Sequence, residues 1–143
     1  MQIHHFTLTA PDDFSAKVAL SGTASLYNLA ALLIKAVGFD FDHCFEFCDN
    51  LKDPYRSKTR YTLFHDIGEG QPGDRSVKKT LVQDVVKPGT RFCFRFDYGD
   101  DWMFLVRSDS VETVAAKRKV SRVLSRSGTP PEQHPDYEEE PEE

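Results

Sequence analysis

Hydrophobic and polar residues alternate along several short segments of this chain, and the alternation predicts β-strands. In residues 6–9, Phe6 and Leu8 fall on one side and two threonines fall on the other. After a turn signal at residues 10–13, the alternation returns in residues 14–20. A period of two residues is typical of a strand with one buried face. Two such strands around a short polar turn favour a β-hairpin.

A different period follows in residues 26–37, where apolar residues recur with the spacing of an amphipathic helix. The residues that form this apolar stripe are Leu26, Leu29, Ala30, Leu33 and Val37. Gly38 comes directly after the stripe, and glycine commonly ends a helix because it adopts left-handed backbone angles without strain. We therefore predict one main helix over residues 26–37.

Further extended segments follow the helix and define the fold class. They are residues 39–48, 60–64, 92–98 and 102–106, with a glycine-rich loop at 66–75 and a short helix at 81–86. The last segment is apolar on both sides, which predicts a strand buried on both faces. The resulting order is ββαββαββ. We predict an α+β fold with a single mixed or antiparallel sheet of about six strands, one main helix packed on one face, and a β-grasp-like topology.

Charge is unevenly distributed along the 143 residues, which are the length of a single domain. Residues 129–143 hold seven of the 23 acidic residues and none of the 18 basic ones. The rest of the chain therefore has two more basic than acidic residues, although the formal net charge is −5. We predict a domain over residues 1–128 and an acidic, disordered tail over residues 129–143.

The three cysteines and the start of the chain indicate a cellular location. Cys44, Cys48 and Cys93 are odd in number, and a chain of this size does not need disulfides for stability. The first ten residues lack the basic start and apolar run of a signal peptide. No apolar stretch approaches the roughly 18 residues that span a bilayer. We expect a cytoplasmic protein with reduced thiols and no membrane partner.

The most informative segment is residues 90–107, in which an acidic turn joins two aromatic strands. The turn brings Asp97, Asp100 and Asp101 within a few residues of one another. Carboxylates clustered with His43 would suit a divalent cation such as Mg²⁺. This pattern supports the hypothesis of a metal site.

We favour a structural interpretation of the same turn. Aspartate hydrogen-bonds its own backbone in turns, and Gly99 would supply a positive φ. His43 shares its predicted strand face with four Phe residues, so we expect it to be buried and to hydrogen-bond an aspartate of the turn. The motifs of nucleophile elbows, phosphate-binding loops and dinucleotide sites do not occur in the sequence. We therefore expect no cofactor and no bound metal.

A basic stretch near the end of the domain is a second candidate site. Residues 117–126 contain five basic residues and no acid. The residues that could contact phosphates are Lys117, Arg118, Lys119 and Arg122. The alternative, which we favour, is an edge strand whose positive charges prevent pairing with another sheet.

Three blocks of this sequence resemble the plasmid pRiA open-reading-frame-three-like family. Residues 26–43 resemble its helix, which is followed by Gly-aromatic and a His. Residues 94–102 resemble its Tyr-Asp-Phe-Gly-Asp-x-Trp turn, the most specific block. Arg122-Val-Leu with Pro130-Pro131-Glu132 resembles its closing segment. Phe104 stands where the family usually has a second His.

The resemblance implies a fold and an association with plasmids and mobile elements, without an established activity. It implies a binding site made of the family-motif residues His43, Asp97, Tyr98, Gly99, Asp100, Asp101 and Trp102. Our first hypothesis is a non-catalytic interaction module that binds a protein or nucleic acid through the turn and the basic stretch. The alternative is a metal-dependent hydrolase with an Asp/His site at the turn.

Overall fold

The computed structural model describes residues 1–53, 56–115 and 118–133, and its main feature is one mixed sheet of eight strands. The strands are β1 (Gln2–Thr9), β2 (Ser15–Ser21), β3 (Phe45–Cys48), β4 (Arg60–Thr62), β5 (Arg75–Ser76), β6 (Arg91–Phe96), β7 (Trp102–Thr113) and β8 (Ser121–Ser127). Their order in the sheet is β5-β4-β3-β6-β7-β1-β2-β8. All neighbours are antiparallel except β4 and β5. The fold is α+β, as predicted.

Helices are few and mostly short. They are the 3₁₀ turn η1 (Pro11–Asp13), α1 (Leu26–Val37), α2 (Leu63–Asp66) and α3 (Val82–Val85). In the described part of the chain, none has the length and apolar character that would let it cross a bilayer.

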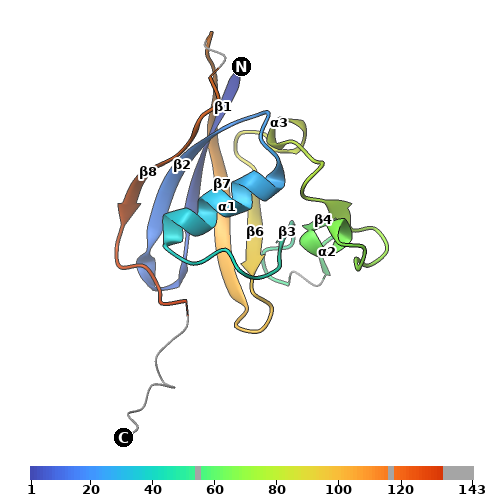
Figure 1. Cartoon of the computed structure of the whole chain (residues 1–143). Helices are drawn as coiled ribbons and strands as arrows, with labels where there is room; N and C mark the ends of the chain where they lie inside the picture. The colour runs from blue at the N-terminus through green and yellow to red at the C-terminus, as the bar shows by residue number, and fades with distance from the viewer. Residues whose placement is uncertain (54–55, 116–117, 134–143) are drawn as a thin grey trace, which may run out of the picture.

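Helix α1 has the predicted bounds and lies across one face of the sheet (Figure 1). The Ser25 side chain accepts a hydrogen bond from the backbone of Asn28, whose own side chain accepts one from the Ser25 backbone. This reciprocal capping satisfies amides that the first turn leaves free. Gly38 ends the helix with φ of 90°. The buried side of α1 packs on aromatic side chains that project from alternate positions of β3, β6 and β7.

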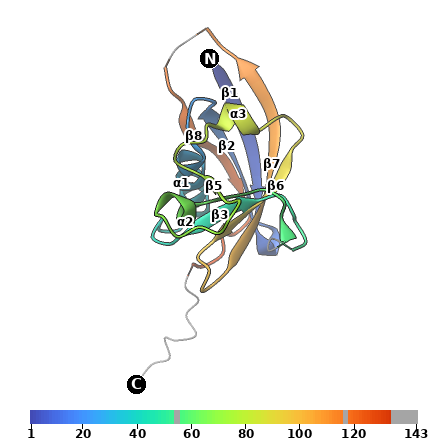
Figure 2. The ribbon, with the colours of Figure 1, turned by 90° about the vertical axis from the view of Figure 1, so that its right-hand side faces the viewer.

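Both predicted hairpins are formed. β1 pairs with β2, and β6 pairs with β7 so that Phe94 lies opposite Phe104. From the side, β1 and β7 appear as long curved strands at the centre of the sheet (Figure 2). The acidic turn joins β6 to β7 at the end of the sheet opposite the N-terminus (Figure 1).

The sheet is larger than predicted. β5 and β8 bring the number of strands to eight instead of about six, and the antiparallel pairing of β7 with β1 at its centre differs from a β-grasp arrangement. Only residues 45–48 of the predicted strand 39–48 pair with neighbours. Phe39 and Phe41 instead lie in the loop after α1, where their rings pack on Phe96. Because these rings pack inward, the sequence of the loop alternates like that of a strand, although its backbone does not pair with a strand.

The face of β7 that is turned away from α1 is also more open than predicted. Leu105 is 37% exposed, whereas its neighbours Phe104 and Val106 are buried. The prediction of burial on both faces was therefore wrong for β7. Buried residues away from α1 do occur, but on β3 and β6, where Glu46, Cys48, Cys93 and Arg95 are all less than 9% exposed. This polar interior leads to the candidate site.

Candidate functional site

Asp97 organises the turn between β6 and β7. Its carboxylate oxygen Oδ1 accepts hydrogen bonds from the backbone amides of Gly99 and Asp100, at 3.1 and 3.3 Å. The amide of Asp101 donates to the carbonyl oxygen of Asp97. The prediction that an aspartate stabilises its own turn is confirmed. The positive φ values, however, belong to Asp97 (67°) and Asp101 (55°) rather than to Gly99.

His43 approaches the turn from the loop after α1. Its Nδ1 lies 2.6 Å from Oδ1 of Asp42, and its Nε2 lies 3.6 Å from Oδ2 of Asp97. The hydrogen bond with Asp42 is the main cause that raises the pKa of His43, and the charge of Asp97 adds to it. His43 thus contacts the turn as an ion pair with Asp97, at a longer distance than the expected hydrogen bond. The expected burial is absent, because the side chain is 39% exposed in a loop rather than on a strand.

The acidic side chains of the turn are directed to different partners. Asp97 bonds the turn backbone, whereas Oδ1 of Asp101 accepts a hydrogen bond from Nε of Arg95 at 2.5 Å. Within the residues that the structure describes, no three His, Cys, Asp or Glu side chains are grouped so that they could hold a metal ion. The geometry of the turn is accounted for by hydrogen bonds within the chain.

Replacing Asp97 by alanine is expected to lower the free energy of unfolding by about 2 kcal/mol, because alanine loses two turn hydrogen bonds and tolerates positive φ poorly. Asparagine keeps an acceptor oxygen and tolerates this backbone region, so Asp97→Asn should cost less than half as much. Urea unfolding of the two variants and the wild type measures both values. Equal losses for Asn and Ala would show that the negative charge, rather than the turn geometry, is what the position requires.

Trp102 lies beside the turn, between the loop after α1 and the segment that follows β8. Its ring packs edge-on against Phe39, with centroids 5.1 Å apart. Its indole Nε1 donates to the carbonyl oxygen of Gln133 at 3.3 Å. The Gln133 side chain also bonds both backbone polar groups of Asp40. Residue 133 therefore fixes the closing segment against the turn, while residues 134–143 of the predicted tail lie outside the described residues.

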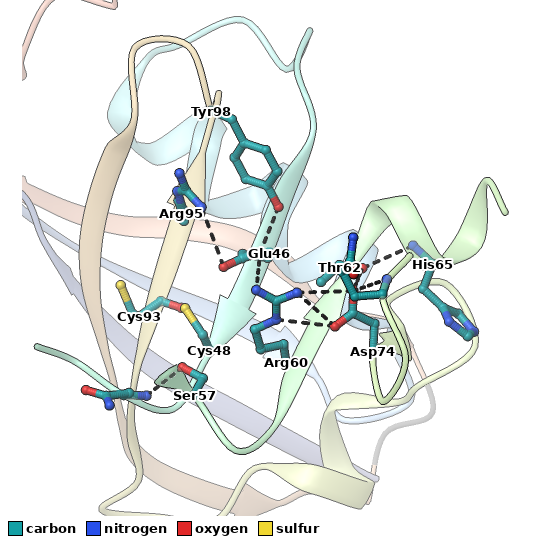
Figure 3. A network of polar contacts seen from close by, with 12 residues as sticks. Glu46, Cys48, Ser57, Arg60, Thr62, His65, Asp74, Cys93, Arg95 and Tyr98 are labelled. Atoms are coloured by element: carbon teal, nitrogen blue, oxygen red, sulfur yellow. Dashed lines mark hydrogen bonds and ion pairs between the residues drawn. The ribbon is translucent and has the colours of Figure 1, made fainter. Parts of the chain in front are cut away.

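A second polar cluster lies on the opposite side of the sheet from α1, and sequence analysis did not identify it. Glu46 on β3 is the cross-strand partner of Arg95 on β6. The hydroxyl of Tyr98 donates to Oε1 of Glu46 at 2.8 Å, and Arg60 from β4 approaches the same oxygen at 3.9 Å. Figure 3 shows Glu46 at the centre of this group, with Arg95, Tyr98 and Arg60 around it. We name Glu46, Arg60, Asp74, Arg95 and Tyr98 the Glu46 cluster.

The loop before β5 completes the Glu46 cluster through Asp74. Arg60 donates from Nε and Nη2 to Oδ1 of Asp74, at 3.2 and 3.0 Å. Burial alone would lower the pKa of Arg60, but the bond to Asp74 and the charge of Glu46 outweigh it and raise the pKa. The other oxygen of Asp74 accepts the backbone amide of Gln71 at 3.0 Å. The carboxylate thus holds both the arginine and its own loop.

Tyr98 links the Glu46 cluster to the turn. The guanidinium carbon of Arg95 lies 4.3 Å from the centre of the Tyr98 ring, and the Phe64 ring lies 5.1 Å from it. Burial and the negative charge of Glu46 raise the pKa of Tyr98 far above its ordinary value. The phenol therefore keeps its proton and acts as a hydrogen-bond donor. Of the predicted binding residues, Tyr98 and Asp101 thus meet the Glu46 cluster, whereas Asp97 meets His43.

The Glu46 cluster borders a surface cavity of about 480 Å³. Phe64, Glu69 and Gln71 complete much of its wall. Oε2 of Glu46 is buried and accepts no hydrogen bond from any described residue. Buried oxygens usually accept a hydrogen bond in folded proteins, so this atom is a position at which a ligand could donate one.

A signal for the Glu46 cluster was present in the sequence. Glu46 lies between two Phe residues, and Arg95 lies between two others. A charge at an inner position of an aromatic strand requires an opposite charge when it is buried. The pairing itself depends on the register of β3 against β6, which local patterns do not reveal.

The basic stretch is distributed over both faces of the edge strand β8. Arg118 and Arg122 line a hollow on the side away from α1, together with His5 and Glu112. Lys119 instead borders a hollow beside α1, and Lys117 lies outside the described residues. Arg118 and Lys119 precede β8, at the end of the sheet opposite the acidic turn (Figure 1). Arg118 and Lys119 therefore do not form one surface with the turn.

Comparisons with known proteins place the chain in a family. Its fold is similar to the crystal structure of a protein of unknown function from Methanosarcina mazei Go1, with a TM-score of 0.71 and 13% sequence identity over 96% of this chain and 86% of that one. No curated protein matches the sequence. The family model described as plasmid pRiA4b ORF-3-like protein matches residues 12–139, so the chain belongs to that family.

Proposed function

We propose that this chain is a non-catalytic binding module whose recognition site is the cavity beside the Glu46 cluster. The observation that carries this proposal is the buried oxygen Oε2 of Glu46, which has no donor among the described residues although Glu46 is one of the residues that line an open cavity. A ligand that supplies this donor would gain a hydrogen bond at an oxygen that has already lost its water.

The chemistry of the cavity supports binding rather than catalysis. General acid–base catalysis depends on groups whose pKa lies near the working pH. The pKa of Tyr98 is raised far above that range, and arginine side chains stay charged. The phenol and the guanidinium groups therefore act as fixed hydrogen-bond donors. They hold a ligand in place without exchanging protons with it.

A protein partner suits this site better than a nucleic acid. The cavity is lined by acidic as well as basic residues, and Arg118 and Lys119, which precede β8, lie at the other end of the sheet. We place the module in the cytoplasm, where free thiols such as those of Cys48 and Cys93 persist. A partner encoded by the same plasmid would agree with the family description.

Nuclear magnetic resonance of the ¹⁵N-labelled full chain tests the proposed function. The chain would be titrated with amino-acid amides, diamines, dicarboxylates and nucleotides. We expect at least one class to shift the amide signals of Glu46, Arg60 and Tyr98 and to remain chemically unchanged over hours. Tyr98→Phe should weaken this binding, and Tyr61→Phe, on the α1 side of the sheet, should not. The proposal fails if no class shifts these signals, or if a bound compound is converted.

A further inference from the structure

We propose that the cavity beside the Glu46 cluster binds a positively charged nitrogen group, either an alkylammonium or a guanidinium. This inference rests on the proposed binding function and adds the chemical class of the ligand. It follows from the unfilled acceptor, from the balance of charges around the cavity and from its aromatic wall.

The unfilled acceptor is the first argument. Oε1 of Glu46 accepts the Tyr98 hydroxyl, but Oε2 accepts no hydrogen bond from the described residues. The nearest cation to Oε2 that forms an ion pair is Nη1 of Arg95, at 4.0 Å. This distance is beyond the range of a hydrogen bond. A group that donates hydrogen bonds and carries positive charge would satisfy both the lone pairs and the charge of Oε2.

The balance of charges is the second argument. The lining of the cavity contains three carboxylates and two guanidinium groups. The carboxylates belong to Glu46, Glu69 and Asp74, and the guanidinium groups belong to Arg60 and Arg95. Each arginine already faces a carboxylate, since Arg60 is bonded to Asp74 and Arg95 is bonded to Asp101 outside the lining. The surplus of negative charge attracts a cation and opposes an anion.

The aromatic wall is the third argument. Phe64 and Tyr98 lie in contact on one side of the cavity. Lysine and arginine side chains bury their methylene stems on apolar surfaces while the charged head reaches a polar group. A cavity of about 480 Å³ has room for such a side chain. The same head group could come from a free diamine or from a basic side chain of a protein partner.

Four probes of known charge test this inference on the ¹⁵N-labelled full chain. They are 1,4-diaminobutane, N-acetyl-lysine methylamide, N-acetyl-arginine methylamide and succinate. We expect at least one cationic probe to shift the amides of Glu46, Tyr98 and Glu69, and succinate to leave them unchanged. Binding of the diamine alone identifies a free polyamine as the source. Binding of a capped amino acid identifies a side chain of a partner.

Two variants and one control relate the binding to the acidic groups. Glu46→Gln should weaken binding of the cationic probe by about tenfold or more, because a hydrogen bond to a charged carboxylate becomes a hydrogen bond to a neutral amide. Glu69→Gln changes an exposed residue, so it should leave the fold intact and weaken binding of the cationic probe about threefold at low salt. Glu112→Gln, an exposed acid outside this cavity, is the matched control and should have no effect.

The outcomes separate this inference from the proposed function. The inference is overturned if succinate or a neutral compound binds at these residues and the cations do not, and the module would then still be a binding protein. It is also overturned if Glu69→Gln binds a cation as tightly as Glu112→Gln does. If no probe of any charge shifts the signals, the proposed function fails together with the inference.

Discussion

Replacing Arg95 by methionine is expected to lower the free energy of unfolding by about 3–5 kcal/mol, because the change leaves the carboxylate of Glu46 buried without its cross-strand cation. Glu46 is 2% exposed and Arg95 is 6% exposed. Methionine preserves most of the volume and the unbranched stem of arginine, so the loss reports the charge rather than a cavity. Urea unfolding at neutral pH, followed by circular dichroism, measures the difference from the wild type.

The matched control for this prediction is Arg91→Met. Arg91 lies on the same strand and the same face as Arg95, but it is exposed and faces Arg107 across the hairpin. Its replacement should change the free energy of unfolding by less than about 0.5 kcal/mol. The double variant Glu46→Gln with Arg95→Met should recover part of the loss, since the buried charge is then absent. Similar losses for Arg91→Met and Arg95→Met would contradict the assigned role of the Glu46 cluster.

The helix and the two hairpins could be predicted because their information is local. The stripe of apolar residues from Leu26 to Val37 and the stop at Gly38 define α1 within one stretch of sequence. The alternation of Phe92, Phe94 and Phe96 likewise defines the inner face of β6. Tertiary packing agrees with the local pattern in these elements, and the predicted bounds of α1 are those observed.

Elements whose pairing depends on distant residues were missed or misjudged. β5 has only two residues and exists because it pairs in parallel with β4. Residues 39–44 carry a strand-like pattern, but the path from α1 to β3 keeps them in a loop. β8 pairs with β2 across about a hundred residues of sequence. The favoured interpretation of the basic stretch as an edge strand is confirmed for residues 121–127, because β8 ends the sheet, but local composition did not reveal that its partner is β2.

The candidate site could be predicted only in part from the sequence, for the same reason. The acidic turn was visible in the sequence, and its family motif directed attention to Tyr98. The partners of Tyr98 come from β3 and β4, which lie far from it in sequence. Glu46 and Arg95 each interrupt an aromatic strand, and only the register of β3 with β6 shows that they face each other. The Glu46 cluster is thus a property of the sheet rather than of any one segment.

Phe94→Ala should be as damaging as the loss of Arg95, with a decrease of about 3–5 kcal/mol in the free energy of unfolding. Phe94 is fully buried on the side of the sheet that faces α1. Its ring stacks on Phe47 with centroids 4.9 Å apart and also packs against Phe45, Phe96 and Phe104. Alanine would leave a cavity that these rings cannot fill without leaving their own positions. Chemical denaturation monitored by fluorescence of the single tryptophan measures the change.

Leu105→Ala provides the comparison on the other face of the same hairpin. Leu105 lies on β7 opposite Cys93 and is 37% exposed, so its truncation removes little buried surface and should cost less than about 1 kcal/mol. A large difference between the two variants would confirm that the aromatic core of β6 and β7 lies on the α1 side. If Leu105→Ala were as destabilising as Phe94→Ala, a second apolar layer would have to cover the opposite face. Such a layer would also have to displace or pair the exposed charged side chains at the edge of the face away from α1.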